Sequence, residues 1–168
     1  MRKLALVAAG VAALLAFAGS AAAIQDVNES RMVGGGWIGN PEIAPNPTIK
    51  VRDGMVLHCD PTVSGNSLEV TWGGGDYFHL TRLDSATCDR NVPGVDDGGV
   101  ISGSGQGRCN GEHAFISFTF SDNTEIRAVP DEAEIAIEGD DPDVCSLSTG
   151  GLLPLLGGNF TFIDDPNI

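Results

Sequence analysis

The chain of 168 residues carries 23 Asp and Glu residues against 9 Lys and Arg residues, a formal net charge of −14 at pH 7. So acidic a chain repels phosphate backbones and anionic lipid headgroups, and no basic cluster offsets the repulsion, so nucleic acid and anionic membranes are excluded as partners. The length suits one domain with a core and is too short for two of ordinary size.

A secretory signal is predicted at the amino terminus. Arg2 and Lys3 precede an apolar run from Leu4 to about Phe17, and small residues follow up to Ala23. This order is typical of a signal peptide, and about 14 apolar residues are fewer than the ~20 that a membrane anchor needs. We therefore expect cleavage after Ala23 and a secreted product of 145 residues (168 − 23) without a membrane segment.

The mature chain is predicted to begin with a flexible polar leader at residues 24–32, followed by one domain at residues 33–163 and a tail at residues 164–168. Removal of the signal takes two basic residues and no acidic ones, which leaves 7 Lys and Arg (9 − 2) against 23 Asp and Glu, a charge of −16. Such a charge keeps an extracellular protein soluble.

Strand patterns begin after a proline-rich loop at residues 40–47. Residues 54–59 are short and half apolar, and residues 66–72 alternate cleanly, with Leu68, Val70 and Trp72 on one face.

The next strand pattern, at residues 77–83, changes phase. Phe78 and Leu80 lie on one face, but the following apolar residue is Leu83, so we predict a bulge near Thr81 and Arg82.

Three consecutive glycines at residues 73–75 separate these two patterns. A phosphate-binding glycine loop needs a helix behind it, so that amide groups and the helix dipole converge on the anion. A strand pattern follows here instead. The glycines are therefore predicted to supply the positive-φ positions of a hairpin.

Alternate glycines mark the strand pattern at residues 100–109, where Gly103, Gly105 and Gly107 lie on one side with Ile101 and Cys109. Such a bare track either admits a large aromatic side chain from the neighbouring strand or the facing sheet, or belongs to a flexible loop. The first is favoured, because the Asn-Gly pair at residues 110–111 predicts a tight hairpin into the strand at residues 113–122.

The last patterns lie at residues 133–139 and 158–163, and no stretch of the mature chain has helical periodicity. Seven or eight short alternating strands predict an all-β fold, an antiparallel β-sandwich of two packed sheets. The residues expected to point into its core from the later strands are Ile116, Phe118, Phe120, Ile135, Ile137, Phe160 and Phe162.

Four cysteines, at positions 59, 88, 109 and 145, all lie in the mature chain. An even number in an exported protein predicts two disulfides, for which three pairings are possible. Zinc is the disfavoured alternative, because no Cys-x-x-Cys pair occurs and the gaps of 29, 21 and 36 residues match no common zinc site.

Carboxylates crowd into two loops, which raises the possibility of calcium-assisted stability. No loop has the regular alternating spacing of calcium ligands, so a solvated acidic surface is the favoured interpretation and no resident cofactor is expected. The candidate calcium ligands are Asp96, Asp97, Asp140, Asp141 and Asp143.

Catalysis is not expected. Of the residues suited to general-base chemistry near neutral pH, the chain has three histidines, at positions 58, 79 and 113, each in or beside a strand pattern. Neither a Gly-x-Ser-x-Gly elbow nor a His-Glu-x-x-His zinc motif occurs. Hydrolysis by paired carboxylates is the remote alternative.

Binding of a glycan or a protein is the favoured activity, with Trp72, Tyr77 and His79 beside the glycine hairpin as candidate ligand contacts. For Trp72 itself, the alternation favours a different interpretation, in which it completes the core face with Leu68 and Val70.

Several motifs occur in an order that resembles the bacterial secreted post-COAP domain. They are the sequences at residues 33–38, 57–60, 66–88, 103–111, 116–123 and 157–160, of which 66–88 is the most specific. The resemblance implies a small extracytoplasmic β-domain, alone or appended to surface and secreted proteins, with no assigned activity. One turn of that family is replaced here by residues 121–135.

The resemblance also implies a disulfide pairing. Cys59 and Cys88 fall at positions that look paired in the family, which implies a Cys59–Cys88 bridge. Cys109 stands where relatives carry tyrosine, and with Cys145 it would form the second bridge.

Overall fold

The computed structural model of the protein describes residues 30–39, 50–90, 98–123 and 129–163. These residues form ten antiparallel strands, and they contain no helix, hence none that could cross a membrane. The predicted signal peptide, the prolines at positions 41, 45 and 47, and the tail lie outside the described residues. The strands are β1 Arg31–Gly39, β2 Lys50–His58, β3 Ser67–Trp72, β4 Asp76–Asp89, β5 Gly99–Cys109, β6 Glu112–Asp122, β7 Glu132–Gly139, β8 Ser146–Ser148, β9 Leu153–Pro154 and β10 Gly157–Ile163.

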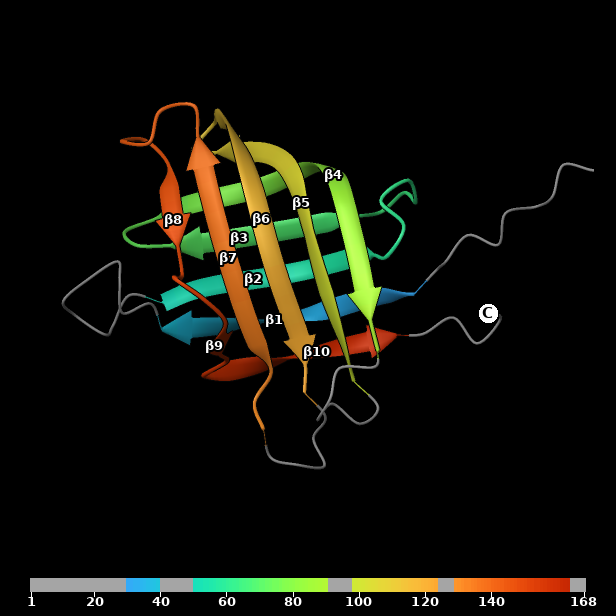
Figure 1. Cartoon of the computed structure of the whole chain (residues 1–168). Helices are drawn as coiled ribbons and strands as arrows, with labels where there is room; N and C mark the ends of the chain where they lie inside the picture. The colour runs from blue at the N-terminus through green and yellow to red at the C-terminus, as the bar shows by residue number, and fades with distance from the viewer. Residues whose placement is uncertain (1–29, 40–49, 91–97, 124–128, 164–168) are drawn as a thin grey trace, which may run out of the picture.

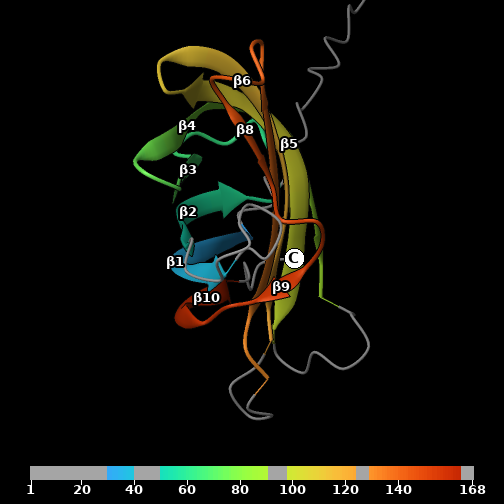
Figure 2. The same cartoon turned by 90° about the vertical axis from the view of Figure 1, so that its left-hand side faces the viewer.

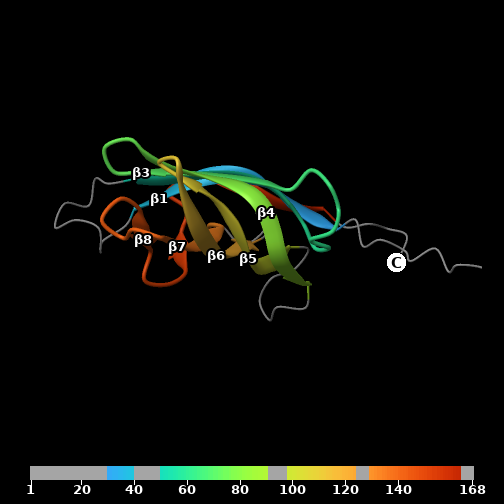
Figure 3. The same ribbon diagram turned by 90° about the horizontal axis from the view of Figure 1, so that it is seen from above.

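One continuous sheet contains all ten strands. Its order is β10-β1-β2-β3-β4-β5-β6-β7-β8, and β9 pairs with β7. The sheet is curled into a half-barrel, so that β10, β1, β2 and β3 cross behind β5, β6 and β7 in Figure 1. Seen from the side and from above, these two groups form facing layers (Figures 2 and 3). We call β10, β1, β2, β3 and the start of β4 the first half-sheet, and the end of β4 with β5 to β8 the second.

The bend between the half-sheets lies in β4. This strand has 14 residues, and its pairing with β5 shifts register between Leu80 and Arg82 and again between Leu83 and Ser85. Bulges bend a strand and increase its twist, so β4 hydrogen-bonds to β3 in one layer and continues in the other. The predicted bulge near Thr81 and Arg82 is confirmed.

The all-β antiparallel fold is confirmed, whereas two separate sheets and seven or eight strands are not. Because β4 passes through both layers, the sheet is continuous, whereas the strand patterns predict two sheets. Three of the ten strands lie outside the predicted patterns. β1 precedes the proline-rich loop after which those patterns begin, and β8 and β9, of three and two residues, are too short to give an alternating pattern.

The core fills the space between the half-sheets. Every residue predicted to point inward from β5, β6, β7 and β10 is buried. The largest fully buried side chains include Phe78, Phe120 and Phe160, which come from strands in both layers. Phe120 stacks on Phe118 and meets Phe160 edge-on, both at ring-centroid distances of 5.3 Å.

Aromatic rings from the neighbouring strands cover two of the alternate glycines of β5, as predicted, and Leu80 covers Gly105 between them. A Cβ atom at Gly103 would lie 2.8 Å from Cζ of Phe118 on β6, and one at Gly107 would lie 2.5 Å from Cζ of Phe78 on β4. Any side chain there would displace a core ring, so the glycine track lets the curled sheet pack closely.

Both predicted hairpins are also confirmed. Gly73 and Gly75 have φ angles of 57° and 126° in the turn between β3 and β4, where the Gly75 amide donates to the Trp72 carbonyl at 3.4 Å. Asn110 and Gly111, with φ angles of 52° and 91°, form the two-residue turn between β5 and β6.

Two disulfides join strand ends, with the implied pairing. Cys59 after β2 bonds to Cys88 at the end of β4, and Cys109 at the end of β5 bonds to Cys145 before β8. They close sequence separations of 29 and 36 residues, and loops of this size stabilise a domain by about 3 kcal/mol each.

Candidate functional site

The three predicted ligand contacts at the glycine hairpin do not share one surface. Trp72 is only 6% exposed and belongs to the core with Leu68 and Val70. Tyr77, 45% exposed, and His79 lie two residues apart on the outer face of β4, where His79 contacts Glu69 across the strands. The hairpin therefore offers one exposed aromatic ring, without the tryptophan.

The acidic loop between β7 and β8 is organised by its own backbone. Asp141 accepts the Asp143 amide through Oδ1 at 3.0 Å, and its carbonyl accepts the amides of Val144 and Cys145, both at 3.1 Å. Asp140 lies instead beside His113, with 3.4 Å between Oδ1 and Nδ1. Within the ranges that the structure describes, no three potential metal ligands converge.

Two of the five candidate calcium ligands, Asp96 and Asp97, lie outside the described residues. Calcium binding stays a prediction.

The three histidines lie at separate places on the sheet. His58 places Nδ1 3.2 Å from Oδ1 of Asn66, His79 contacts Glu69, and His113 lies on β6. No two of these described imidazoles share a partner. General acid–base chemistry requires such groups to face one substrate atom, and this arrangement does not bring them together.

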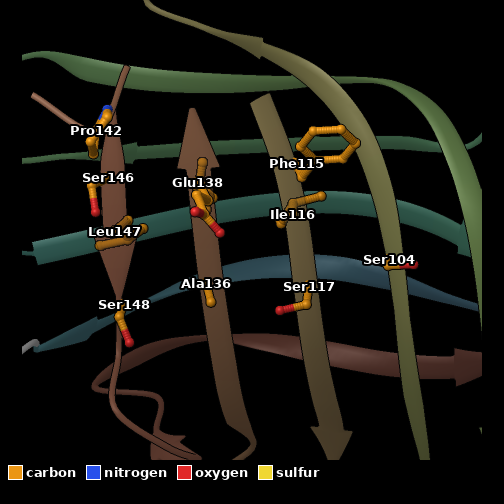
Figure 4. Close-up of a pocket in the computed structure, with 11 residues that line it drawn as sticks. Ser104, Phe115, Ile116, Ser117, Ala136, Glu138, Pro142, Ser146, Leu147 and Ser148 are labelled. Carbon is orange, nitrogen blue, oxygen red and sulfur yellow. The ribbon is translucent and has the colours of Figure 1, made fainter. Parts of the chain in front are cut away.

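A hollow lined by an aromatic ring, serine hydroxyls and a carboxylate lies on the outer face of the second half-sheet. It has a volume of about 480 Å³, within the range typical of small-ligand sites. Figure 4 shows the hollow, which we call the Phe115 groove. The outward-facing residues that line it are Ser104, Phe115, Ser117, Ala136, Glu138, Ser146 and Ser148.

Strand register explains why these residues meet. Side chains alternate between the two faces of a strand, so neighbours in register form rows across the outer face. Ser104 pairs with Ser117, Ser117 with Ala136, and Ala136 with Ser148. The small side chains of this row form the floor of the groove, which crosses four strands at right angles to them.

The adjacent row forms the wall. Phe115 on β6 lies between Gln106 on β5 and Glu138 on β7, and Glu138 pairs with Ser146 on β8. Figure 4 shows Phe115 and Glu138 on the adjacent strands β6 and β7. Phe115 is 49% exposed although it is a large apolar residue.

The Phe115 ring is held in position by His113. The two rings meet edge-on, with centroids 4.8 Å apart and an interplanar angle of 89°. His113 itself lies between Asp140 and Gln106, with 3.5 Å between its Nε2 and Oε1 of Gln106. Edge-to-face contacts stabilise aromatic pairs, so Phe115 presents a pre-oriented face to a ligand.

Hydroxyl groups continue the floor beyond the groove. The Oγ atoms of Ser85 on β4 and Ser104 are 2.8 Å apart, and Ser102 and Thr119 form a second pair at 3.1 Å. The outer face of the second half-sheet is thus rich in groups that both donate and accept hydrogen bonds.

Phe115 and its groove were not predicted from the sequence. The available signal was the alternation at residues 113–122, in which Phe115 is out of phase with the buried Ile116, Phe118 and Phe120. This phase places its large apolar ring on the outer face of the strand, beside the serine row.

A second unusual side chain is a carboxyl group on the inner face of β2. Asp53 lies in phase with the buried Val51 and Met55. Its Oδ1 accepts the Gly36 amide at 3.1 Å, while Oδ2 is buried and has no hydrogen-bond partner. Burial raises the pKa of Asp53 to about 6, and the Gly36 hydrogen bond opposes the shift.

No family model, curated protein or solved structure matches this chain. The functional conclusion therefore depends on the chemistry of the site. The likeness to the post-COAP domain stays a prediction.

Proposed function

We propose that the protein is an exported, non-catalytic interaction module that binds a glycan in the Phe115 groove. The observation that carries the proposal is a half-exposed phenylalanine ring, held edge-on by His113, beside a floor of serine hydroxyls.

This combination suits a sugar. The face of a pyranose ring carries C–H groups that pack on an aromatic face, and its hydroxyls both donate and accept hydrogen bonds. Phe115 supplies the aromatic face, while the hydroxyls of Ser104, Ser117 and Ser148 can exchange hydrogen bonds with the sugar hydroxyls. The lining residues come from the four neighbouring strands β5 to β8, which span about 14 Å, so the groove accommodates a chain of sugars.

The groove supports binding without hydrolysis. Glycoside hydrolysis uses two carboxyl groups facing each other across the scissile bond. Among the described residues that line the groove, Glu138 contributes the one carboxylate. With no opposing acid, a bound glycan would be held without being cut.

Two disulfides support export, because such bonds persist in oxidising compartments and are rare where thiols are kept reduced. They fit the predicted signal peptide at residues 1–23 and a place outside the cytoplasm. The facing half-sheets also support describing the fold as a sandwich of two crossed layers joined through β4. We further propose that the protein is related to the post-COAP domain that its sequence motifs resemble.

Calorimetric titration with soluble hexasaccharides of glucose, mannose and xylose tests the proposal. We expect at least one to bind, and Phe115→Ala to weaken its binding roughly tenfold, about 1.4 kcal/mol. Tyr77→Ala is the matched control, since Tyr77 is exposed to a similar extent on the other half-sheet. Loss of binding in Tyr77→Ala with full binding in Phe115→Ala would move the site to the glycine hairpin.

A further inference from the structure

Building on the proposed function, we propose that the Phe115 groove is selective for uncharged glycans and that Glu138 is the residue that determines this selectivity. The charge and the position of the Glu138 side chain carry this proposal about the class of ligand.

Glu138 lies where a sugar stacked on Phe115 would present its hydroxyls. It is the cross-strand neighbour of Phe115 on one side and of Ser146 on the other. Its side chain is exposed and projects from the outer face of β7 between them, as Figure 4 shows. Within the described residues, the Glu138 carboxylate makes no hydrogen bond or ion pair.

An ionised carboxylate accepts hydrogen bonds and donates none. Glu138 can therefore accept from two hydroxyls of a neutral sugar, which makes charge-assisted hydrogen bonds. A uronic acid or a sulfated sugar would place a second negative group beside it, and like charges at contact distance repel.

None of the described residues that line the groove is Lys, Arg or His, so none of them offsets that repulsion. Arg108 and His113 form a different cross-strand row, next to Asp140, and the Arg82 side chain is paired with Asp84 at 2.6 Å. The net charge of −14 adds repulsion at longer range.

Glu134 offers a matched comparison on the same strand. It is exposed on the same outer face of β7, four residues from Glu138, and it does not line the groove. At about 3.3 Å per residue, the two positions are roughly 13 Å apart. Changing either residue to lysine alters the net charge equally, so only a local effect separates the two variants.

The experiment measures dissociation constants for two sets of probes: the hexasaccharides of glucose, mannose and xylose, and hexamers of galacturonic and mannuronic acid. The protein is compared with Glu138→Lys and Glu134→Lys, each shown to be folded by its amide NMR spectrum. We expect the protein to bind a neutral probe at least tenfold more tightly than either anionic probe. Glu138→Lys should reduce this ratio by roughly tenfold, and Glu134→Lys should leave it within a factor of two.

Three results would overturn the inference. Binding of the anionic hexamers as tightly as the neutral ones would refute it and leave the glycan-binding function intact. Equal effects of the two lysine variants would assign the selectivity to net charge instead of Glu138. Failure of all five probes to bind would refute the proposed function as well.

Discussion

Asp53 provides a sharp test of the packing between the half-sheets. Its carboxyl group points from β2 into the core, and Oδ2 has neither solvent nor a hydrogen-bond partner. We consider the substitution Asp53→Asn, which keeps the oxygen that accepts the Gly36 amide and removes the ionisable group.

The pKa shift gives the size of the effect. Burial raises the pKa of Asp53 from 3.8 to about 6, a difference of about 2 units or ~3 kcal/mol. Because the folded state holds the proton more tightly than the unfolded state, stability from this group is fully present below pH 3.8. It is lost as the pH rises to about 6, so the free energy of unfolding falls by ~3 kcal/mol over that window.

Urea denaturation at intervals between pH 3.5 and pH 7, with the disulfides kept oxidised, measures this dependence. The free energy of unfolding of Asp53→Asn minus that of the unmodified protein should rise by ~3 kcal/mol across the window. Asp60→Asn serves as a control of opposite sign, since hydrogen bonds from Thr62 lower the pKa of Asp60. Parallel profiles for Asp53→Asn and the unmodified protein would refute the assignment of Asp53 as a buried, poorly solvated acid.

Two further substitutions test the close packing and the sheet edge. Gly107→Val should lower the free energy of unfolding by about 3 kcal/mol, because the new side chain would overlap a core ring. The control Gly74→Ala should have little effect, because the space around Gly74 is open. Equal urea midpoints for the two variants would contradict the close packing at Gly107. Asp131→Ala removes the buried carboxylate that accepts the Phe160 amide at 2.6 Å, so we expect a loss of about 2 kcal/mol and faster hydrogen exchange at Phe160. Unchanged exchange would show that this carboxylate does not hold β10.

Much of the fold follows from local patterns. Alternation identified the buried faces of β3, β6, β7 and β10, and the change of phase between Leu80 and Leu83 located the bulge that bends β4. The absence of side chains at Gly103 and Gly107 predicted that aromatic rings fill the space there, and Phe118 and Phe78 provide these rings.

The continuity of the sheet could not be predicted in the same way. Alternation says which face of a strand is buried, and it is silent on whether two buried faces belong to one curled sheet or to two. That depends on how far the long β4 extends past its bulges, a property of its pairing with β5. Strands of two or three residues, such as β9 and β8, leave no alternating pattern at all.

The phase of the strand patterns distinguishes the buried aromatic residue from the exposed one. Trp72 is in phase with Leu68 and Val70 and is buried, while Phe115 is out of phase with its apolar neighbours and is exposed. The groove itself depends on Ala136 and Ser117 meeting across two strands. That contact between distant parts of the chain has no local signature in the sequence.

The proposed glycan site lies on the outer face of the second half-sheet. Amide NMR spectra recorded during titration with the hexasaccharides of glucose, mannose and xylose report binding there residue by residue. We expect the largest shift changes at Ser117, Ala136 and Glu138, and we expect Phe115→Ala to require roughly ten times more sugar to produce them. Changes confined to Tyr77 and the glycine hairpin, or no changes with any of the three sugars, would contradict the proposed site.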